Sequence, residues 1–219
     1  MFKTISRHEL AIQQLQTSEQ FTNGWVPDLH AWTYASATTM TTPGDVTAQY
    51  PVGTKIQLTQ TTAKYFYAVS ASYSAPNTTL TLTGGSDYSL ANAAISAVQW
   101  SVATSPQGFP QWFNWTPTWT GLTVTGAPSY GGRFAINGRT VTIWVLMNPN
   151  GGTYASTSGT TYINNAPITI ANVGTGVIAA VAQPSAIGSG VVAMQTNQIY
   201  TPTFAANSNW LEMICHCDI

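Results

Sequence analysis

Residues 133–147, RFAINGRTVTIWVLM, decide the fold class of this chain. Polar and apolar residues alternate on both sides of Asn137-Gly138, as they do in antiparallel strands with one buried face. Asn-Gly between two such runs is the strongest short-range hairpin signal, because a type I′ turn needs positive φ at both central residues. The stretch therefore predicts a β-hairpin with strands at 133–136 and 139–147 and a type I′ turn at Asn137-Gly138.

Strand signals of the same kind cover most of the chain beyond Trp25. Threonine and aromatic residues favour strands, and Phe, Trp and Tyr together make up 11% of the sequence. Residues 91–97 are rich in alanine and predict a helical turn instead. Runs bounded by Gly, Pro and Asn predict further strands at 54–59, 64–72, 79–83, 96–102, 161–163, 168–171, 176–182, 190–195, 198–204 and 210–216. The expected fold class is all-β.

A Pro/Gly segment at 105–110, SPQGFP, is the expected linker between two β domains. The chain has 219 residues, which is enough for two modest domains. Many short strands separated by turns are typical of β-sandwiches and barrels. We therefore expect a small β-barrel or sandwich at 25–106 and a C-terminal jelly-roll-like β-sandwich head at 107–219.

The first 24 residues predict a short helix, with a capping box in its first turn and a stop at Asn23-Gly24. Ile5 and Ile12 fall on one heptad position and Leu15 on the other, so these three residues are the expected oligomerisation contact. Two interpretations stay open. The helix either folds onto its own chain, or it forms an oligomeric stalk or attachment segment.

Charged residues are unusually rare. Asp, Glu, Lys and Arg make up 6% of the chain, against about 25% in an ordinary soluble domain, and the net charge is -1. Binding to nucleic acid or to an anionic membrane requires clustered basic residues. The composition therefore argues against both kinds of partner. The apolar runs also fall short of the roughly 20 residues that a membrane-spanning helix needs, and the first residues lack the apolar core of a signal peptide.

The sequence contains little material for catalysis. The seven acidic residues form no motif, and there are only three histidines. No nucleophile elbow, phosphate loop, dinucleotide fingerprint or zinc-protease motif is present. We therefore expect no enzyme activity and no cofactor.

Cys215-His216-Cys217 is the one string that resembles a set of metal ligands. In an extended strand the two thiols face one side and the imidazole the other, so a monomer offers two soft ligands rather than three. A symmetric oligomer could complete a metal site on its axis, but the ordinary interpretation is packing of two buried thiols. The Cα atoms of two residues that lie two positions apart on a strand are at the limit of the distance that a disulfide can span. A disulfide between Cys215 and Cys217 is therefore not expected. We expect free thiols, assembly in a reducing cytoplasm, and no metal.

Four aromatic residues that enter the second domain are the candidate ligand-binding residues: Trp112, Trp115, Trp119 and Tyr130. Aromatic faces stack on sugar rings, and aromatic residues are enriched at recognition hot spots. Tryptophans in such an arrangement also commonly serve as core or inter-domain packing. Both interpretations remain open at this stage.

Several stretches of the chain look like a module that recurs in tail and fibre proteins of tailed bacteriophages. They are WTYASATT at 32–39, GDVT at 44–47, YPVGTKI at 50–56, TQTTAKYF at 59–66, NTT at 77–79, GGSDYSL at 84–90 and PQGFP at 106–110. The pattern from WTP at 115–117 through Tyr130 to RFAINGRTV at 133–141 is similar to the start of many phage receptor-binding head domains. The resemblance spans roughly residues 25–147 and implies a homotrimeric fibre or spike, attached to other virion proteins by its N-terminal segment. No extended shaft is present.

The leading hypothesis is a non-enzymatic virion adhesion protein that recognises a host-surface glycan or protein through residues 107–219. Weak sites repeated by symmetry would add up to strong attachment, and sparse charge would make binding nearly independent of salt. The alternative is a capsid-decorating head fibre or a purely structural virion protein. A glycan depolymerase is the third and weakest hypothesis.

Overall fold

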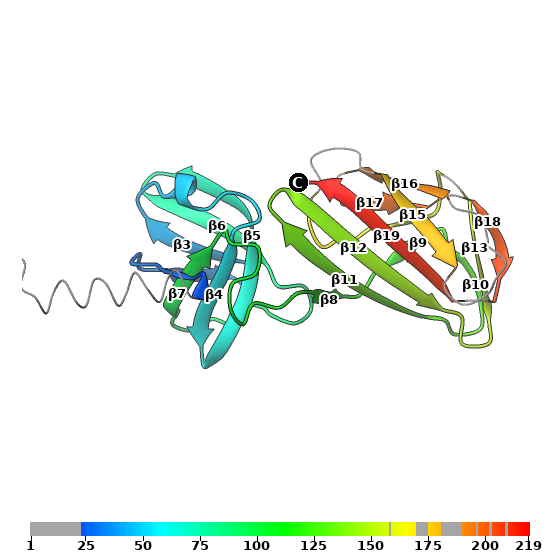
Figure 1. Ribbon diagram of the computed structural model, residues 1–219, viewed down its shortest axis with the longest axis horizontal. Helices are drawn as coiled ribbons and strands as arrows, with labels where there is room; N and C mark the ends of the chain where they lie inside the picture. Colours follow the sequence, from blue (N-terminus) through cyan, green and yellow to red (C-terminus); the bar gives the residue numbers. More distant parts are fainter. Residues whose placement is uncertain are drawn as a thin grey trace, which may run out of the picture.

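The computed structural model describes residues 23–157, 159–169, 175–180, 190–195, 197–201, 203–208 and 210–219. The expected N-terminal helix, with Ile5, Ile12 and Leu15, lies outside these residues. The all-β prediction is confirmed, because strands account for nearly all regular structure in the described residues. The two sheet systems of the chain lie end to end along the long axis (Figure 1).

The first sheet is antiparallel throughout and has the strand order β1-β7-β4-β5-β6-β3-β2. Its strands are β1 (Val26–Pro27), β2 (Thr33–Ser36), β3 (Thr39–Pro43), β4 (Lys55–Gln60), β5 (Thr62–Ser74), β6 (Asn77–Thr83) and β7 (Ser96–Ser101), with a 3₁₀ helix η1 at Thr47–Gln49. Alternation along β4 and β6 directs Ile56, Leu58, Leu80 and Leu82 into one core. This sheet contains the strands expected at 54–59, 64–72, 79–83 and 96–102.

The helical turn expected at 91–97 is absent. Residues 91–95 form a loop whose backbone is bonded to the side chain of Gln60, and residues 96–97 already belong to β7. The Gln60 amide donates to the carbonyls of Ala91 and Ala93 and accepts from the Ala91 N–H. Gln60 is buried at the end of β4. Side-chain bonds of this kind replace the backbone bonds that a helix would supply, so alanine content alone did not determine the conformation.

The second region has a nine-stranded antiparallel sheet of order β8-β11-β12-β19-β15-β16-β17-β14-β9 and a three-stranded sheet of order β10-β13-β18. The strands are β8 (Phe113–Trp115), β9 (Trp119–Thr120), β10 (Thr123–Thr125), β11 (Ser129–Asn137), β12 (Thr140–Asn148), β13 (Thr153–Ser156), β14 (Tyr162–Ile163), β15 (Thr175–Ala180), β16 (Gly190–Gln195), β17 (Gln198–Tyr200), β18 (Phe204–Asn207) and β19 (Leu211–Asp218). The inward residues of β11, β12 and β19 fill its core.

Both large sheets have edge strands that are consecutive in the chain. β8 and β9 are the two edges of the nine-stranded sheet, yet only residues 116–118 separate them. β1 and β2 are the edges of the first sheet and are separated by residues 28–32. A connection reaches at most about 3.6 Å per residue. Each sheet must therefore curl until its edges nearly meet, which gives the two-layered, sandwich-like form seen in Figure 1.

The hairpin at 133–147 is confirmed, but its turn lies one residue further on. Ile136 pairs with Val141 and Asn137 with Thr140, so the two-residue loop is Gly138-Arg139. Gly138 has φ +61° and Arg139 has no positive φ, which fits a type II′ rather than the expected type I′ turn. A loop at Asn137-Gly138 would have placed Arg139 opposite Ile136 on the core side. The observed register places Val141 there instead.

The Pro/Gly segment expected as a linker lies between the two sheet systems and is packed. The ring of Phe109 lies 6.0 Å from that of Trp25, 5.0 Å from that of Tyr67 and 5.5 Å from that of Phe113. The backbones also approach closely, because a Cβ on Gly53 would lie 2.1 Å from the carbonyl oxygen of Gly138. At the junction, β5, the 102–112 segment and the β11–β12 hairpin therefore pack directly against one another.

Candidate binding site at the domain junction

The structure separates the four aromatic residues that the sequence grouped. Trp115 points into the core, is 7% exposed and donates its indole N–H to the Asn165 carbonyl at 2.8 Å. Trp119 and Tyr130 pack against the same core with ring centroids 6.0 Å apart. Trp112 lies on the opposite, outer side of the sheet. Three of the four residues therefore contribute to packing, and only Trp112 lies beside the pocket described below.

Trp112 belongs to a stack on the outer face of the nine-stranded sheet. The guanidinium of Arg133 lies 4.9 Å from the Trp112 ring and 4.3 Å from the Trp144 ring. Arg133 on β11 is directly opposite Trp144 on β12, so the sheet register creates this contact. The Trp144 indole N–H donates to the Glu212 carboxylate on β19. We call Trp112, Arg133, Trp144 and Glu212 the outer-face stack.

Trp144 and Glu212 were missed as site residues, although the sequence contains a signal for one of them. Along β12 the residues alternate between two faces. Trp144 shares one face with Thr140 and Thr142, whereas Val141 and Ile143 lie on the buried face. A tryptophan at a polar position of an amphipathic strand is expected on the outer face. Glu212 carries no comparable signal, because its contact with Trp144 joins strands 68 residues apart.

A pocket of about 420 Å³ opens beside the outer-face stack, at the domain junction. Its walls come from both sheet systems and from the segment between them: Lys55, Phe109, Gln111, Trp112, Asn137 and Thr142 all line it. The volume is in the range of about 300–1,000 Å³ typical of small-molecule sites. Aromatic walls combined with amide and hydroxyl groups suit a ligand that has both apolar and polar faces.

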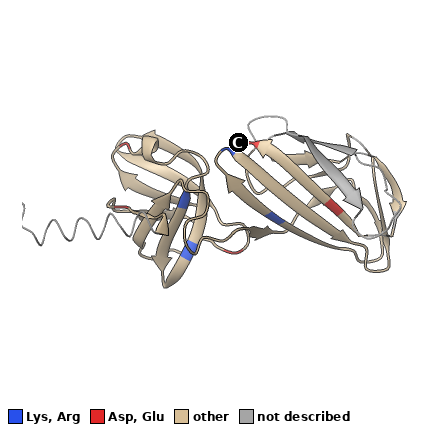
Figure 2. Ribbon diagram, viewed as in Figure 1, with Lys and Arg blue, Asp and Glu red and all other residues tan. Residues whose placement is uncertain are grey.

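Lys55 is the charged group of this pocket. The residue is only 3% exposed, and its ammonium lies 5.7 Å from the ring centroids of both Tyr67 and Phe109. Burial lowers the pKa of Lys55, because a desolvated ammonium loses hydration. Within the described residues the ammonium has no hydrogen bond and no carboxylate partner. Figure 2 shows how few strands carry any charge, and Lys55 is the buried cation among them.

The Cys215-His216-Cys217 string divides between the two faces of β19, as alternation requires. Both thiols are buried and free, and His216 lies on the outer face, where its Nδ1 is 3.0 Å from the Thr142 hydroxyl. Burial raises the pKa of Cys215 and of Cys217 to about 12 in each case. No group of three possible metal ligands occurs in the described part of the chain.

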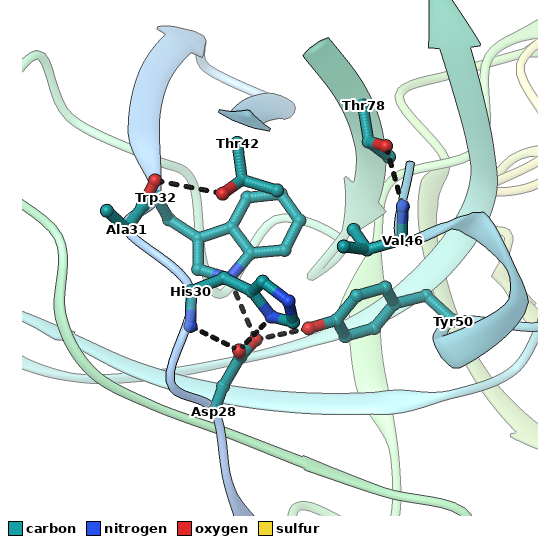
Figure 3. A network of polar contacts seen from close by, with 8 residues as sticks. All are labelled: Asp28, His30, Ala31, Trp32, Thr42, Val46, Tyr50 and Thr78. Carbon is teal, nitrogen blue, oxygen red and sulfur yellow. Dashed lines mark hydrogen bonds and ion pairs between the residues drawn. The ribbon is translucent and has the colours of Figure 1, made fainter. Parts of the chain in front are cut away.

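A second polar cluster, centred on Asp28, joins the edges of the first sheet (Figure 3). One carboxylate oxygen accepts from the His30 backbone at 2.9 Å and from its ring at 2.7 Å. The other accepts from the Trp32 indole at 2.8 Å and from the Tyr50 hydroxyl. The Asp28 side chain is fully buried. Because the four donors surround the carboxylate and leave no open face, this cluster holds the edge strands β1 and β2 together. We call the line along which the two edges of a sheet approach each other its seam.

Comparison of the chain with protein-family models, with curated proteins and with solved structures gave no match. In the part of the chain that the structure describes, no helix has the length and apolar character needed to span a bilayer.

Proposed function

We propose that this protein is a non-enzymatic adhesion protein of a phage virion, which recognises a host-surface glycan or protein by multivalent binding. The observation that carries the proposal is the outer-face stack beside the junction pocket. It adds a structural argument to the resemblance of residues 25–147 to phage tail and fibre modules. The homotrimer, the jelly-roll-like head and attachment to other virion proteins through the N-terminal segment belong to the same proposal.

The outer-face stack has the chemistry of a recognition surface. Trp and Arg are the residue types most enriched at binding hot spots, and the rings of Trp112 and Trp144 are partly exposed. The cation–π contacts with both rings restrain the Arg133 guanidinium, so little side-chain freedom is lost when a ligand binds. Ile214, 39% exposed, lies directly opposite Trp144 on β19 and extends the apolar part of this surface.

Threefold repetition would convert a weak single site into firm attachment. The low charge of the chain supports recognition by stacking and neutral hydrogen bonds rather than by long-range steering. Attachment should accordingly change little with ionic strength, because few charge pairs are available to be screened.

Competition for adsorption tests the proposal. Purified protein added to host cells should reduce adsorption of the virion, and Trp144→Ala should weaken this competition about tenfold or more. Tyr73→Ala is the matched control, because Tyr73 is an exposed aromatic residue on β5, away from the pocket and the stack. Unaltered near-ultraviolet circular dichroism outside the tryptophan band would show that the variant is folded. No competition by the wild-type protein, and no binding to host cells, would refute the adhesion function.

The packing of Trp115, Trp119 and Tyr130 favours a second candidate, a capsid-decorating head fibre or structural virion protein without receptor binding. That function predicts many copies on the head, visible by antibody labelling of particles, and adsorption that is unchanged when the protein is deleted. Labelling at the tail tip together with reduced adsorption would favour the adhesion protein.

A further inference from the structure

The ammonium of Lys55 has neither a hydrogen bond nor a carboxylate partner among the described residues. Lysine is almost never fully buried unless a partner compensates its charge. Here the residue is 3% exposed, and its ammonium lies 5.7 Å from the ring centroids of Tyr67 and Phe109. Aromatic faces stabilise a cation only in part. The ammonium borders a pocket of about 420 Å³, so an anionic group can reach it from solvent.

The acidic residues of the first sheet system are bonded elsewhere and do not neutralise Lys55. Asp28 accepts four hydrogen bonds at the β1–β2 seam, Asp45 accepts from Thr47, and Asp87 accepts from the backbone and side chain of Asn114. Lys64, the other lysine of this sheet, lies outside the pocket and donates to the carbonyl of Ser89. Among the described residues, Lys55 is therefore the cation that lines the pocket.

We infer that the junction pocket binds a saccharide unit that carries a carboxylate, with the Lys55 ammonium pairing with that carboxylate and the Trp112 ring lying against the sugar. The inference rests on the proposed adhesion function, to which it adds a class of ligand.

The charge of the site favours a carboxylate over a phosphate. One ammonium balances one negative charge, whereas a phosphate monoester carries about −1.5 to −2 at neutral pH. Arg133 contacts the rings of Trp112 and Trp144 on the outer face, and it does not line the pocket. A phosphate bound here would carry more negative charge than the one ammonium of Lys55 balances.

The remaining walls favour a sugar over a peptide. Gln111, Asn137 and Thr142 bring amide and hydroxyl groups to the pocket, and Trp112 adds an aromatic wall. A sugar ring presents hydroxyl groups around its rim and an apolar C–H face, so it can use both kinds of wall at once. A peptide that binds by adding a strand to a sheet needs a free sheet edge. The strands at the pocket offer no such edge, because β4, β11 and β12 are each paired on both sides.

The pocket depends on the close contact between the two domains. Lys55 and Tyr67 come from the first sheet system, Gln111 and Trp112 from the connecting segment, and Thr142 from the second sheet system. Neither domain alone contains the cation and the sugar-binding walls together. The packed junction keeps the two halves of the site in register.

A ligand-observed NMR titration of the full-length chain tests the inference, with D-glucuronate as the probe and D-glucose as its neutral counterpart. Glucuronate should bind at least about tenfold more tightly than glucose, the effect of one additional charge pair. Lys55→Met should abolish that preference, and Lys64→Met should retain it because it removes the same charge outside the pocket. Thr104→Trp, at the exposed rim, should block both sugars without altering Lys55.

Equal affinity for the two sugars, no binding of glucuronate, or undiminished binding by the folded Lys55→Met or Thr104→Trp variant would overturn the inference. Tighter binding of inorganic phosphate would overturn the carboxylate assignment. Equally tight binding of acetate or of a short acidic peptide would overturn the saccharide assignment.

The adsorption assay separates failure of this inference from failure of the proposed function. Wild-type protein that competes with the virion while failing to bind glucuronate would refute only the pocket ligand. Protein that binds glucuronate through Lys55 while leaving adsorption unchanged would refute the adhesion function and leave the pocket assignment standing. The expected result is competition by the wild type and by Lys64→Met, and its weakening in Lys55→Met.

Discussion

The two large sheets of this protein both curl until their edge strands nearly meet, but different polar groups stabilise the two closures. In each, the edge strands are consecutive in the chain, so a short connection must hold the seam. The seam of the first sheet is fastened by a fully buried carboxylate, Asp28, which accepts four hydrogen bonds. The seam of the second is fastened by the neutral, partly exposed amide of Asn165.

The Asn165 side chain bridges both ends of the β8–β9 connection. Its carbonyl oxygen accepts from the Thr118 N–H at 2.7 Å, and its amide donates to the Thr116 carbonyl at 3.0 Å. Its backbone carbonyl also accepts from the Trp115 indole. Water can replace most of what this amide does, because its surroundings are exposed. The Asp28 side chain is fully buried, so its loss leaves the buried Trp32 indole and Tyr50 hydroxyl unpaired. Exposure should therefore decide how strongly each seam depends on its fastening residue.

The largest expected effect is that of Asp28→Ala. Removing the carboxylate leaves the Trp32 indole and the Tyr50 hydroxyl buried without their acceptor, so the free energy of unfolding of the first domain should fall by about 3–5 kcal/mol. Hydrogen-exchange mass spectrometry of the full chain measures this domain by domain. Protection should fall in peptides from β4 to β6 and remain in peptides from β11 and β12. Equal loss in both domains would show that the seams are not independent.

An intermediate effect is expected from alkaline pH. Unfolded thiols ionise near pH 9, whereas burial holds the pKa of Cys215 and Cys217 at about 12 in the folded state. Above about pH 9 the unfolded state therefore binds fewer protons than the folded state. The second domain should lose about 1.4 kcal/mol of stability per pH unit for each thiol.

The first domain should lose less stability than the second over the same range, because the contribution of Lys55 opposes that of Tyr50, Tyr67 and Tyr88, whose pKa values burial raises. Burial lowers the pKa of Lys55, so the folded ammonium deprotonates before the unfolded one and its contribution to stability rises with pH until the unfolded lysine also titrates. Urea unfolding between about pH 8 and about pH 10, read by subtilisin cleavage with the sites assigned by mass, reports each domain. The Cys215→Ala/Cys217→Ala double variant should flatten the profile of the second domain. A profile that stays steep in this variant would exclude the thiols as its cause.

The smallest expected effect is that of Asn165→Ala. The Thr118 N–H and the Thr116 carbonyl lose a partner but remain accessible to water, so the free energy of unfolding of the second domain should fall by about 1 kcal/mol. The urea midpoint of that domain measures the change, with Asn164→Ala as a neighbouring amide control. A loss as large as that of Asp28→Ala would contradict the role assigned to exposure.

The longer strands were mostly predictable because their signal is local. The short strands β1, β2, β8, β9, β10 and β13 were not predicted, and residues 168–169, expected in a strand, lie in none. Alternation between buried and exposed positions identifies β4, β6, β11, β12 and β19, and Gly138 marks the central hairpin. The exact loop was not predictable from Asn-Gly alone, because the cost of placing Arg139 in the core decides the register. Trp115 and Trp112 could not be assigned to opposite faces either, since β8 has only three residues and too short a period to show which face is buried.

By itself the sequence determined the fold class, the two β-rich regions and the sparsely charged surface, because these follow from composition and from a two-residue period. Only the tertiary structure decided where the charges and rings meet. Asp28 accepts a hydrogen bond from Tyr50, which is 22 residues away in the sequence. The Lys55 ammonium lies over the ring of Phe109, a residue of the segment between the domains. Such contacts depend on how a curled sheet brings together strands that are far apart in the sequence. A local sequence pattern does not show which distant residues will be in contact.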